Sequence, residues 1–308
     1  MKKLESIPWF ICDEGDTNFI AYNDTDSLYV NAEPLVKFLY PDFGSKSDEQ
    51  KDNLVEKVAL EYQDLINEYY DEMAKTIFNI QDSHKFEMKT EAVIRSAYFR
   101  KTRRYAQWIT KSEGIDVDKL DIKGLEFMKA NFPPLFGKFF NELLNQVIKG
   151  ANQKQIDDQI QDFRDKVLGN LNPVLLGNPT SIKTLNKYIE PRKAGEILSS
   201  IKLGAPAQVK AAIRYNDLLY LWKLNKKHSE IVQGDKIKWV YLKPNPYKIE
   251  TIAFLEFDLP QKIHTFIEEY IDRKKSFDTI LLNKLEGFYS DLEWQLNVNQ
   301  YIKKFFSL

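Results

Sequence analysis

The chain has 308 residues, of which 43% are hydrophobic and 13% aromatic, so it can bury a substantial core and is long enough for about two domains. Its single cysteine, Cys12, excludes an internal disulfide framework, and no apolar run approaches the roughly 20 residues of a membrane span. We therefore expect a cytoplasmic protein that has no membrane partner.

Charge is segregated along the chain, so the net charge of −1 says little about binding partners. Residues 46–72 carry nine acidic and three basic side chains, whereas residues 85–104 carry seven basic and two acidic ones. Residues 183–214 are again basic, with seven Lys and Arg against two acids. An acidic helix thus masks two basic stretches in the sum, and such stretches are the features to weigh for nucleic-acid binding.

The first patterned segment, residues 19–30, reads FIAYNDTDSLYV. Its two apolar ends predict short buried strands, and the Asn-Asp pair between them is typical of a turn. Asp24 and Asp26 then lie near the tip of a β-hairpin and on one face, because strand residues alternate. Two carboxylates held so close favour a divalent cation between them. The alternative is that both are turn residues that bond their own backbone.

Residues 48–76 place apolar side chains at helical spacing, and we expect the acidic opposite face to be solvated. Residues 84–126 contain short segments rich in β-branched and aromatic residues. These predict antiparallel strands that share one sheet with the hairpin. A helix lying on an antiparallel sheet is an α+β layer, which is the fold class we predict.

Phe132-Pro133-Pro134 marks a boundary, after which the pattern is mostly helical. We expect helices at roughly 135–149, 153–168, 180–189, 205–225 and 262–283. A β-hairpin that turns at Pro244-Asn245-Pro246 interrupts them. The second part is therefore expected to be a mostly helical domain that contains one hairpin.

Other chemistries find little support in the sequence. His84, His228 and His264 are isolated and lack the spacing of metal ligands, and no Walker A or G-x-G-x-x-G loop is present. The Asp-x-Asp motif of sugar-nucleotide transferases also follows a buried strand, but it needs a nucleotide-binding unit ahead of it. Only 23 residues precede Asp24, which disfavours that interpretation.

The stretch YNDTDS, residues 22–27, resembles the palm motif Tyr-Gly-Asp-Thr-Asp-Ser of family B DNA polymerases. Asn23 stands where glycine is usual, and Asn is the other residue best suited to a left-handed turn. Later segments resemble further elements of that family in the same order. RKTRRYA at 100–106 resembles the basic Lys-Lys-Arg-Tyr element, IKGLE at 122–126 resembles the Met-Gly-Leu-Glu that closes the palm, and APAQVKAAIRYN at 205–216 resembles a thumb segment. LNKLEGFYSDLEWQ at 282–295 and YIKKFFSL at 301–308 resemble the last helix and the sliding-clamp peptide of bacteriophage-type replicative polymerases.

The resemblance implies roles for particular residues. Asp26 would be the principal ligand of two Mg²⁺ ions and Asp24 its neighbour, with a further aspartate from a partner chain. Residues expected to support them are Thr25, Ser27 and Glu91. Residues expected to contact primer–template DNA are Arg103, Arg104, Tyr105, Lys123 and Glu126. The alternative for the arginines is a solvated strand edge.

The family's upstream Asp-x-x-Ser-Leu-Tyr-Pro motif, its fingers and its exonuclease carboxylates have no counterpart in this sequence. The resemblance therefore implies the end of a polymerase palm at 1–130, a thumb at 131–296 and a clamp-interacting tail at 297–308. We expect an N-terminal polymerase chain to supply the missing carboxylate and the fingers that bind dNTP. The alternatives are a truncated remnant and a non-catalytic module that binds DNA and a sliding clamp.

The C-terminal tail carries bulky apolar side chains at Phe305, Phe306 and Leu308. By the resemblance they would dock into a sliding clamp, where adjacent anchors fill one pocket well. The alternative is that they fold back on the thumb as a small cluster.

Overall fold

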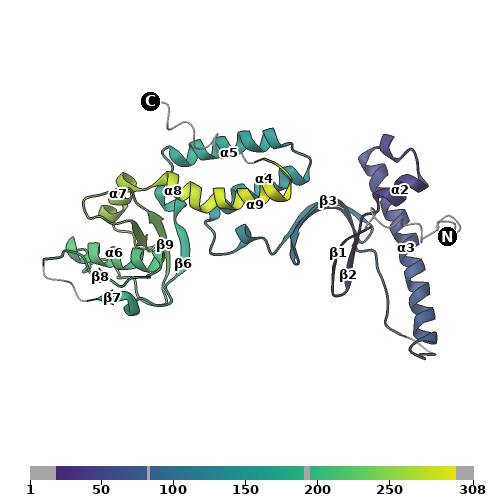
Figure 1. Cartoon of the computed structure of the whole chain (residues 1–308), viewed down its shortest axis with the longest axis horizontal. Helices are drawn as coiled ribbons and strands as arrows, with labels where there is room; N and C mark the ends of the chain where they lie inside the picture. The colour runs from purple at the N-terminus through teal and green to yellow at the C-terminus, as the bar shows by residue number, and fades with distance from the viewer. Residues whose placement is uncertain (1–18, 82–83, 191–194, 296–308) are drawn as a thin grey trace. The chain divides into compact units, whose positions relative to one another are not determined.

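The computed structural model describes residues 19–81, 84–190 and 195–295. Helices and antiparallel sheets alternate along the chain (Figure 1), which confirms the predicted α+β class. The chain divides into two compact units, residues 1–124 and 125–308, whereas the sequence placed its boundary at residue 130. In the described ranges, no helix is long and apolar enough to cross a membrane.

The first unit combines strands with one long helix. Its described elements are β1 (Ile20–Asp24), β2 (Ser27–Val30), α2 (Glu33–Leu39), the 3-10 turn η1 (Phe43–Ser45), α3 (Asp48–Thr76), β3 (Ala92–Lys101), β4 (Arg104–Ser112) and β5 (Ile115–Lys123). β3, β4 and β5 form an antiparallel meander, as expected. β1 and β2 form a separate two-stranded sheet, so the prediction of one shared sheet is wrong. The hairpin meets the meander through aromatic side chains instead of a backbone ladder.

The hairpin at 19–30 is present, but its strands are not buried as predicted. Phe19, Ile20, Leu28 and Val30 are all more than a third exposed. β1 and β2 pair Tyr22 with Tyr29, and it is the tyrosine rings that pack inward. The apolar pattern therefore identified the strands but not the face that packs.

Helix α3 confirms the prediction for 48–76 at both ends. It begins at a capping box, in which the Ser47 hydroxyl accepts from the backbone of Gln50 and the Gln50 side chain accepts from the backbone of Ser47. One buried contact of the helix is Val58, which packs with Val36 and Phe43 into a small core.

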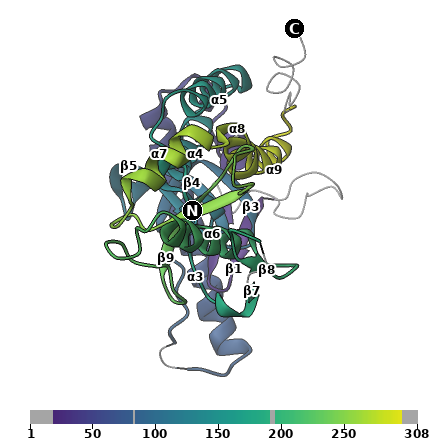
Figure 2. The same ribbon diagram turned by 90° about the vertical axis from the view of Figure 1, so that its left-hand side faces the viewer.

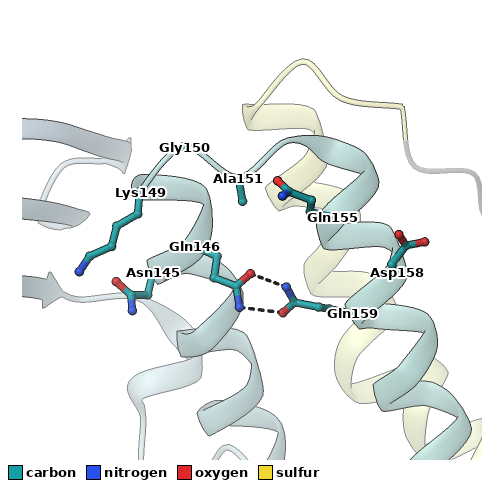
Figure 3. A pocket seen from close by; sticks show the side chains of 8 residues that line it. All are labelled: Asn145, Gln146, Lys149, Gly150, Ala151, Gln155, Asp158 and Gln159. Carbon is teal, nitrogen blue, oxygen red and sulfur yellow. Dashed lines mark hydrogen bonds between the residues drawn. The ribbon is translucent and has the colours of Figure 1, made fainter.

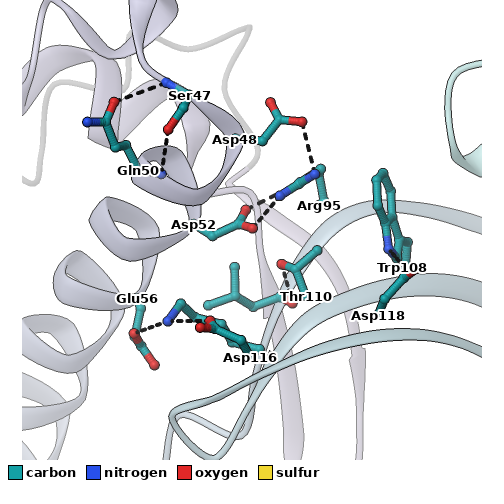
Figure 4. A network of polar contacts seen from close by, with 12 residues as sticks. Ser47, Asp48, Gln50, Asp52, Glu56, Arg95, Trp108, Thr110, Asp116 and Asp118 are labelled. Atoms are coloured by element: carbon teal, nitrogen blue, oxygen red, sulfur yellow. Dashed lines mark hydrogen bonds and ion pairs between the residues drawn. The ribbon is translucent and has the colours of Figure 1, made fainter.

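One face of α3 is held to the meander by charge (Figure 4). Arg95 of β3 donates to Asp48 at 3.0 Å and also to Asp52, while Lys111 of β4 lies 3.1 Å from Glu56. The three acids are spaced four residues apart and so share one helix face. The prediction that the acidic face is solvated is wrong for Asp52 and Glu56, because the sheet beneath presents basic side chains, whereas the Asp48 side chain remains exposed.

The second unit has a helical layer and a three-stranded sheet. Its described elements are η2 (Glu126–Met128), α4 (Pro134–Ile148), α5 (Gln153–Leu168), η3 (Pro173–Leu176), β6 (Asn178–Ser181), η4 (Asn186–Tyr188), β7 (Ile189–Glu190), β8 (Ser200–Ile201), α6 (Ala207–Leu221), β9 (Lys236–Tyr241), β10 (Thr251–Phe254), α7 (Gln261–Tyr270), α8 (Arg273–Phe277), the π-helical η5 (Asp278–Leu282) and α9 (Asn283–Asp291). The helices expected near 135–149, 153–168 and 205–225 and the hairpin around Asn245 are confirmed.

The helical layer is packed by phenylalanines. Phe139 of α4 and Phe163 of α5 stack with ring centroids 3.8 Å apart, and Phe136 meets Phe163 edge-on. Phe140 contacts Phe288 of α9 in the same way. Elsewhere in this unit, α6 lies against β9 and β10 (Figures 1 and 2), so a second core forms between a helix and the sheet β10-β9-β6.

Two helix predictions in this unit are wrong. Residues 180–189 do not form an α-helix, because β6 pairs with β9 and the chain after it makes only the 3-10 turn η4; the buried Ile182 and Leu185 have a spacing that imitates a helix turn. The helix expected at 262–283 breaks after Tyr270, where the backbone leaves the helix to bond the end of β9: Tyr270 O accepts from Lys243 at 2.7 Å. Backbone pairing with a strand outweighs helical periodicity at both places.

Candidate active site

The tip of the first hairpin is a tight turn that presents two carboxylates. Asp24 pairs with Ser27, which leaves Thr25 and Asp26 as the loop, and the backbone N–H of Asp26 donates to the carbonyl of Asp24 at 2.7 Å. Thr25 has φ +57°, a left-handed conformation that is unusual for a β-branched residue. The placement of both aspartates at a tip is as expected. The left-handed position is Thr25 and not Asn23, which lies within β1.

A second hairpin tip meets the first. Arg103, at the turn between β3 and β4, has φ +59°. Its Nε donates to Asp24 Oδ2 at 2.8 Å, its Nη2 donates to Oδ1 at 3.3 Å, and its backbone N–H donates to Tyr22 Oη at 2.9 Å. The hydrogen bonds from Arg103 hold the pKa of Asp24 below its usual range, and the same pair raises the pKa of Arg103. The tip therefore carries an ionised carboxylate that faces a permanent cation.

Asp26 is exposed, and among the described residues its carboxylate has no hydrogen bond or ion pair. Carboxylate oxygens are the donors that Mg²⁺ takes, so Asp24 and Asp26 fit this ion in kind. Two carboxylates are too few ligands for the ion, and the described residues hold no group of three acidic, His or Cys side chains that could bind a metal. Asp26 is free to serve as a ligand, whereas Asp24 would have to give up Arg103.

An aromatic cluster fixes the two tips relative to each other. It consists of Tyr22, Tyr29, Phe99 and Tyr105, whose ring centroids lie 5.2–5.9 Å apart. The hydroxyls of Tyr29 and Tyr105 lie 3.2 Å apart, and burial raises the pKa of Tyr29. Tyr105 is only 6% exposed, which favours a positioning role over direct contact with DNA. Tyr22 was missed from the sequence, although its place two residues before Asp24 puts both on one strand face.

The residues around Gly124 complete the basic end of the meander. Gly124 has φ +66°, and a Cβ atom there would overlap the carbonyl oxygen of Arg103, so only glycine fits. Next to it, Lys123 Nζ lies 5.8 Å from the ring centroid of Tyr105. The hydrogen bond to Tyr105 raises the pKa of Lys123, which keeps it charged. Arg104 begins β4 and is half-buried. The requirement for glycine in IKGLE was not foreseen.

Other predicted site residues lie apart from these tips or outside the description. Glu91 stands just before β3, where its carbonyl accepts from the N–H of Glu113 at 2.9 Å, and the structure records no contact between it and Asp24 or Asp26. Glu126 belongs to the second unit and pairs with Lys284 of α9. Residues outside the described ranges are Cys12, Phe305, Phe306 and Leu308.

The thumb-like segment at 205–216 forms most of α6, whose last turns hold loops in place. Arg214 pairs with Asp217 at 2.8 Å, and Asp217, 3% exposed, also accepts from the Ser199 hydroxyl at 2.6 Å. Asn216 bonds both the N–H and the carbonyl of Ile231. These side chains organise the second unit and offer no reactive group.

A groove of about 560 Å³ lies between the C-terminal end of α4 and the start of α5 (Figure 3). Half of its lining residues carry side-chain amides; the full lining is Asn145, Gln146, Lys149, Gly150, Ala151, Gln155, Asp158 and Gln159. Gln146 and Gln159 bond each other through both amide groups, which closes one side of it. The groove belongs to the second unit, and its only charged lining residues are Lys149 and Asp158, so the hairpin tips, where the sequence motif lies, are the stronger candidate.

No protein-family model matches the chain, and no curated protein matches it either.

Proposed function

We propose that the chain takes part in template-directed DNA synthesis as the palm end and thumb of a family B DNA polymerase. The observation that carries the proposal is the meeting of Asp24, which shares its turn with Asp26, and Arg103 at the tips of two hairpins. The sequence motif and the RRY element are far apart in the chain, yet they come together in space. The resemblance places both segments in one polymerase palm, so their meeting supports it, whereas two unrelated turns have no need to meet.

In this proposal each group has a distinct task. Asp26, with Asp24, binds divalent cations, which when bound activate the primer 3′-oxygen and neutralise charge on the phosphate. Arg103 and Lys123 bind DNA phosphates, since both are exposed cations at one end of the meander. The aromatic cluster holds the carboxylate tip rigidly, as a reactive constellation requires.

The tips alone supply too few metal ligands. A two-metal site needs further carboxylates, and the described residues gather no third one at Asp24 and Asp26. We propose that a partner polypeptide brings the missing aspartate together with the fingers that bind dNTP. The outer face of the first hairpin, at Ile20, Leu28 and Val30, is apolar and exposed, as a surface made for such a partner would be.

The alternative is a non-catalytic module that binds DNA and a sliding clamp. It is favoured by one observation, the engagement of both carboxylate oxygens of Asp24 by Arg103. A carboxylate tied in this way serves structure as well as it would serve catalysis.

Primer extension with Mg²⁺ tests the proposal, using the chain with and without a candidate partner that carries the missing motif. We expect extension only with both chains, and we expect Asp26→Asn to lower its rate by about 100-fold or more at unchanged thermal stability. Asp158→Asn, at the groove of the second unit, is the matched control and should leave the rate unchanged. If Asp26→Asn keeps more than about a tenth of the activity, the role of Asp26 as a metal ligand is wrong and the non-catalytic alternative stands.

A further inference from the structure

The Arg103 guanidinium lies against Asp24 in the position that a metal ion bound to this carboxylate would take. Both oxygens of the carboxylate are used, Oδ2 by Nε at 2.8 Å and Oδ1 by Nη2 at 3.3 Å, and Oδ1 also accepts from the hydroxyl of Thr25 at 3.1 Å. The guanidinium thus lies where a metal ion bound to Asp24 would have to lie. Asp26, one residue beyond the turn, has no such partner among the described residues.

We propose that Arg103 competes with a divalent cation for Asp24, and that DNA relieves the competition by drawing the guanidinium onto a phosphate. Binding of the cation and binding of primer–template DNA are then positively coupled. The inference rests on the proposed function, since it takes Asp24 as a metal ligand and Arg103 as a phosphate ligand.

The pair is built to exchange partners. The Arg103 side chain is 73% exposed and that of Asp24 27%, and ion pairs this accessible to water are weak and easily displaced. A guanidinium fork matches phosphate as well as it matches carboxylate, so a DNA phosphate can replace Asp24 without loss of hydrogen bonds.

The backbone of Arg103 is fixed by its neighbours, whereas its exposed side chain is held by Asp24 and can exchange that partner. The N–H is bonded to Tyr22 Oη, and Gly124 packs against the carbonyl. Only the side chain can therefore move when the partner changes, and the carboxylate tip stays where the aromatic cluster holds it. A switch of this kind needs no rearrangement of the fold.

Coupling between two ligands is reciprocal, which makes it measurable from either side. We would titrate the full chain with Mn²⁺, counting free ion by electron paramagnetic resonance, with and without a primer–template DNA hairpin. For the wild type we expect DNA to tighten Mn²⁺ binding by roughly 1.5- to 5-fold, the range that release of one exposed ion pair allows. Ions bound by the DNA itself are measured with Asp24→Asn present and subtracted.

Arg103→Gly is the decisive variant, because glycine tolerates the left-handed backbone at this position and the variant should fold. Without DNA it should bind Mn²⁺ as tightly as the wild type does with DNA, and adding DNA should change its affinity little. Lys101→Ala is the matched control: it removes one positive charge from the end of β3, next to the same turn, and should keep the wild-type dependence on DNA.

The outcomes separate the two proposals. Equal Mn²⁺ affinity of wild type and Arg103→Gly, with binding that Asp24→Asn weakens, overturns the competition and leaves the metal site in place. An equal gain in Lys101→Ala also overturns it, because general electrostatics then explains the effect. Failure of the wild type, Arg103→Gly and Lys101→Ala to bind Mn²⁺, with or without DNA, overturns the competition; the same failure after addition of the partner that carries the missing aspartate also overturns the metal role in the proposed function.

Discussion

Three residues in left-handed conformations lie where the two hairpin tips meet. Thr25 and Arg103 stand at the two tips, and Gly124 closes against the second. A side chain in this conformation costs roughly 1–2 kcal/mol unless it is glycine, so it persists only where surrounding contacts impose it. Here the aromatic cluster and the Arg103–Asp24 pair impose it.

Replacing Gly124 by alanine should destabilise the first unit. The Cβ atom would overlap the Arg103 carbonyl and φ would be strained as well, so we expect a loss of about 2–4 kcal/mol when both effects are combined. Gly114→Ala is the matched control, because φ is +81° there and its Cβ would meet only Glu56 Oε1 at 3.9 Å. Urea unfolding of both variants measures the difference. Equal losses would mean that the close approach to Arg103 is absent in solution.

The elements of this protein differ in how far local sequence determines them. Helix α3 was predicted over its full range, because an apolar stripe at helical spacing is a local signal. The break after Tyr270 and the strand β6 were not, because each depends on pairing with β9, which lies far away in the sequence.

The candidate site likewise has a part that local sequence determines and a part that a long-range contact determines. The turn that carries Asp24 and Asp26 is local, and it was predicted from the hairpin pattern. The contact of Asp24 with Arg103 joins residues 79 positions apart, and no spacing rule reaches that far. The family resemblance placed both segments in one palm but did not imply that they pair.

The docking of α3 on the meander should weaken at high pH. Hydrogen bonds from Lys111 to Asp116 and Glu56 raise the pKa of Lys111 above its ordinary value. A raised pKa means that the stabilisation is fully present below the unfolded pKa, about 10.4, and is lost as pH rises through the folded value. Lys111→Met should therefore flatten the fall of the urea midpoint between about pH 9 and pH 12. Lys119→Met, an exposed lysine on β5, should not.

At the scale of the whole molecule, a basic side chain is available to bind a polyanion only where it is not already paired with an acid of the chain. Residues 85–104 are strongly basic in sequence, yet Arg95 is taken up by Asp48 and Asp52 of α3. The bases at the hairpin end of the meander remain in reach of solvent, with Arg103 exposed and held only by its weak pair with Asp24. The net charge of −1 therefore understates the capacity of this surface to bind a polyanion.

Binding of primer–template DNA by the full chain should show this difference between the bases as a difference in salt dependence. Each phosphate contact contributes about 0.9 to the slope of log K against log salt, so Arg103→Ala combined with Arg104→Ala should flatten the slope by up to about 1.8 for all DNA sequences alike. Arg95→Gln comes from the same basic stretch and should leave the slope unchanged, because that side chain already serves α3. Fluorescence anisotropy over a range of salt concentrations gives the slopes, and circular dichroism shows that each variant is folded. A slope that falls equally in both variants would show that DNA does not distinguish the tip from the helix-bound face, and would reject the hairpin end as the primer–template contact.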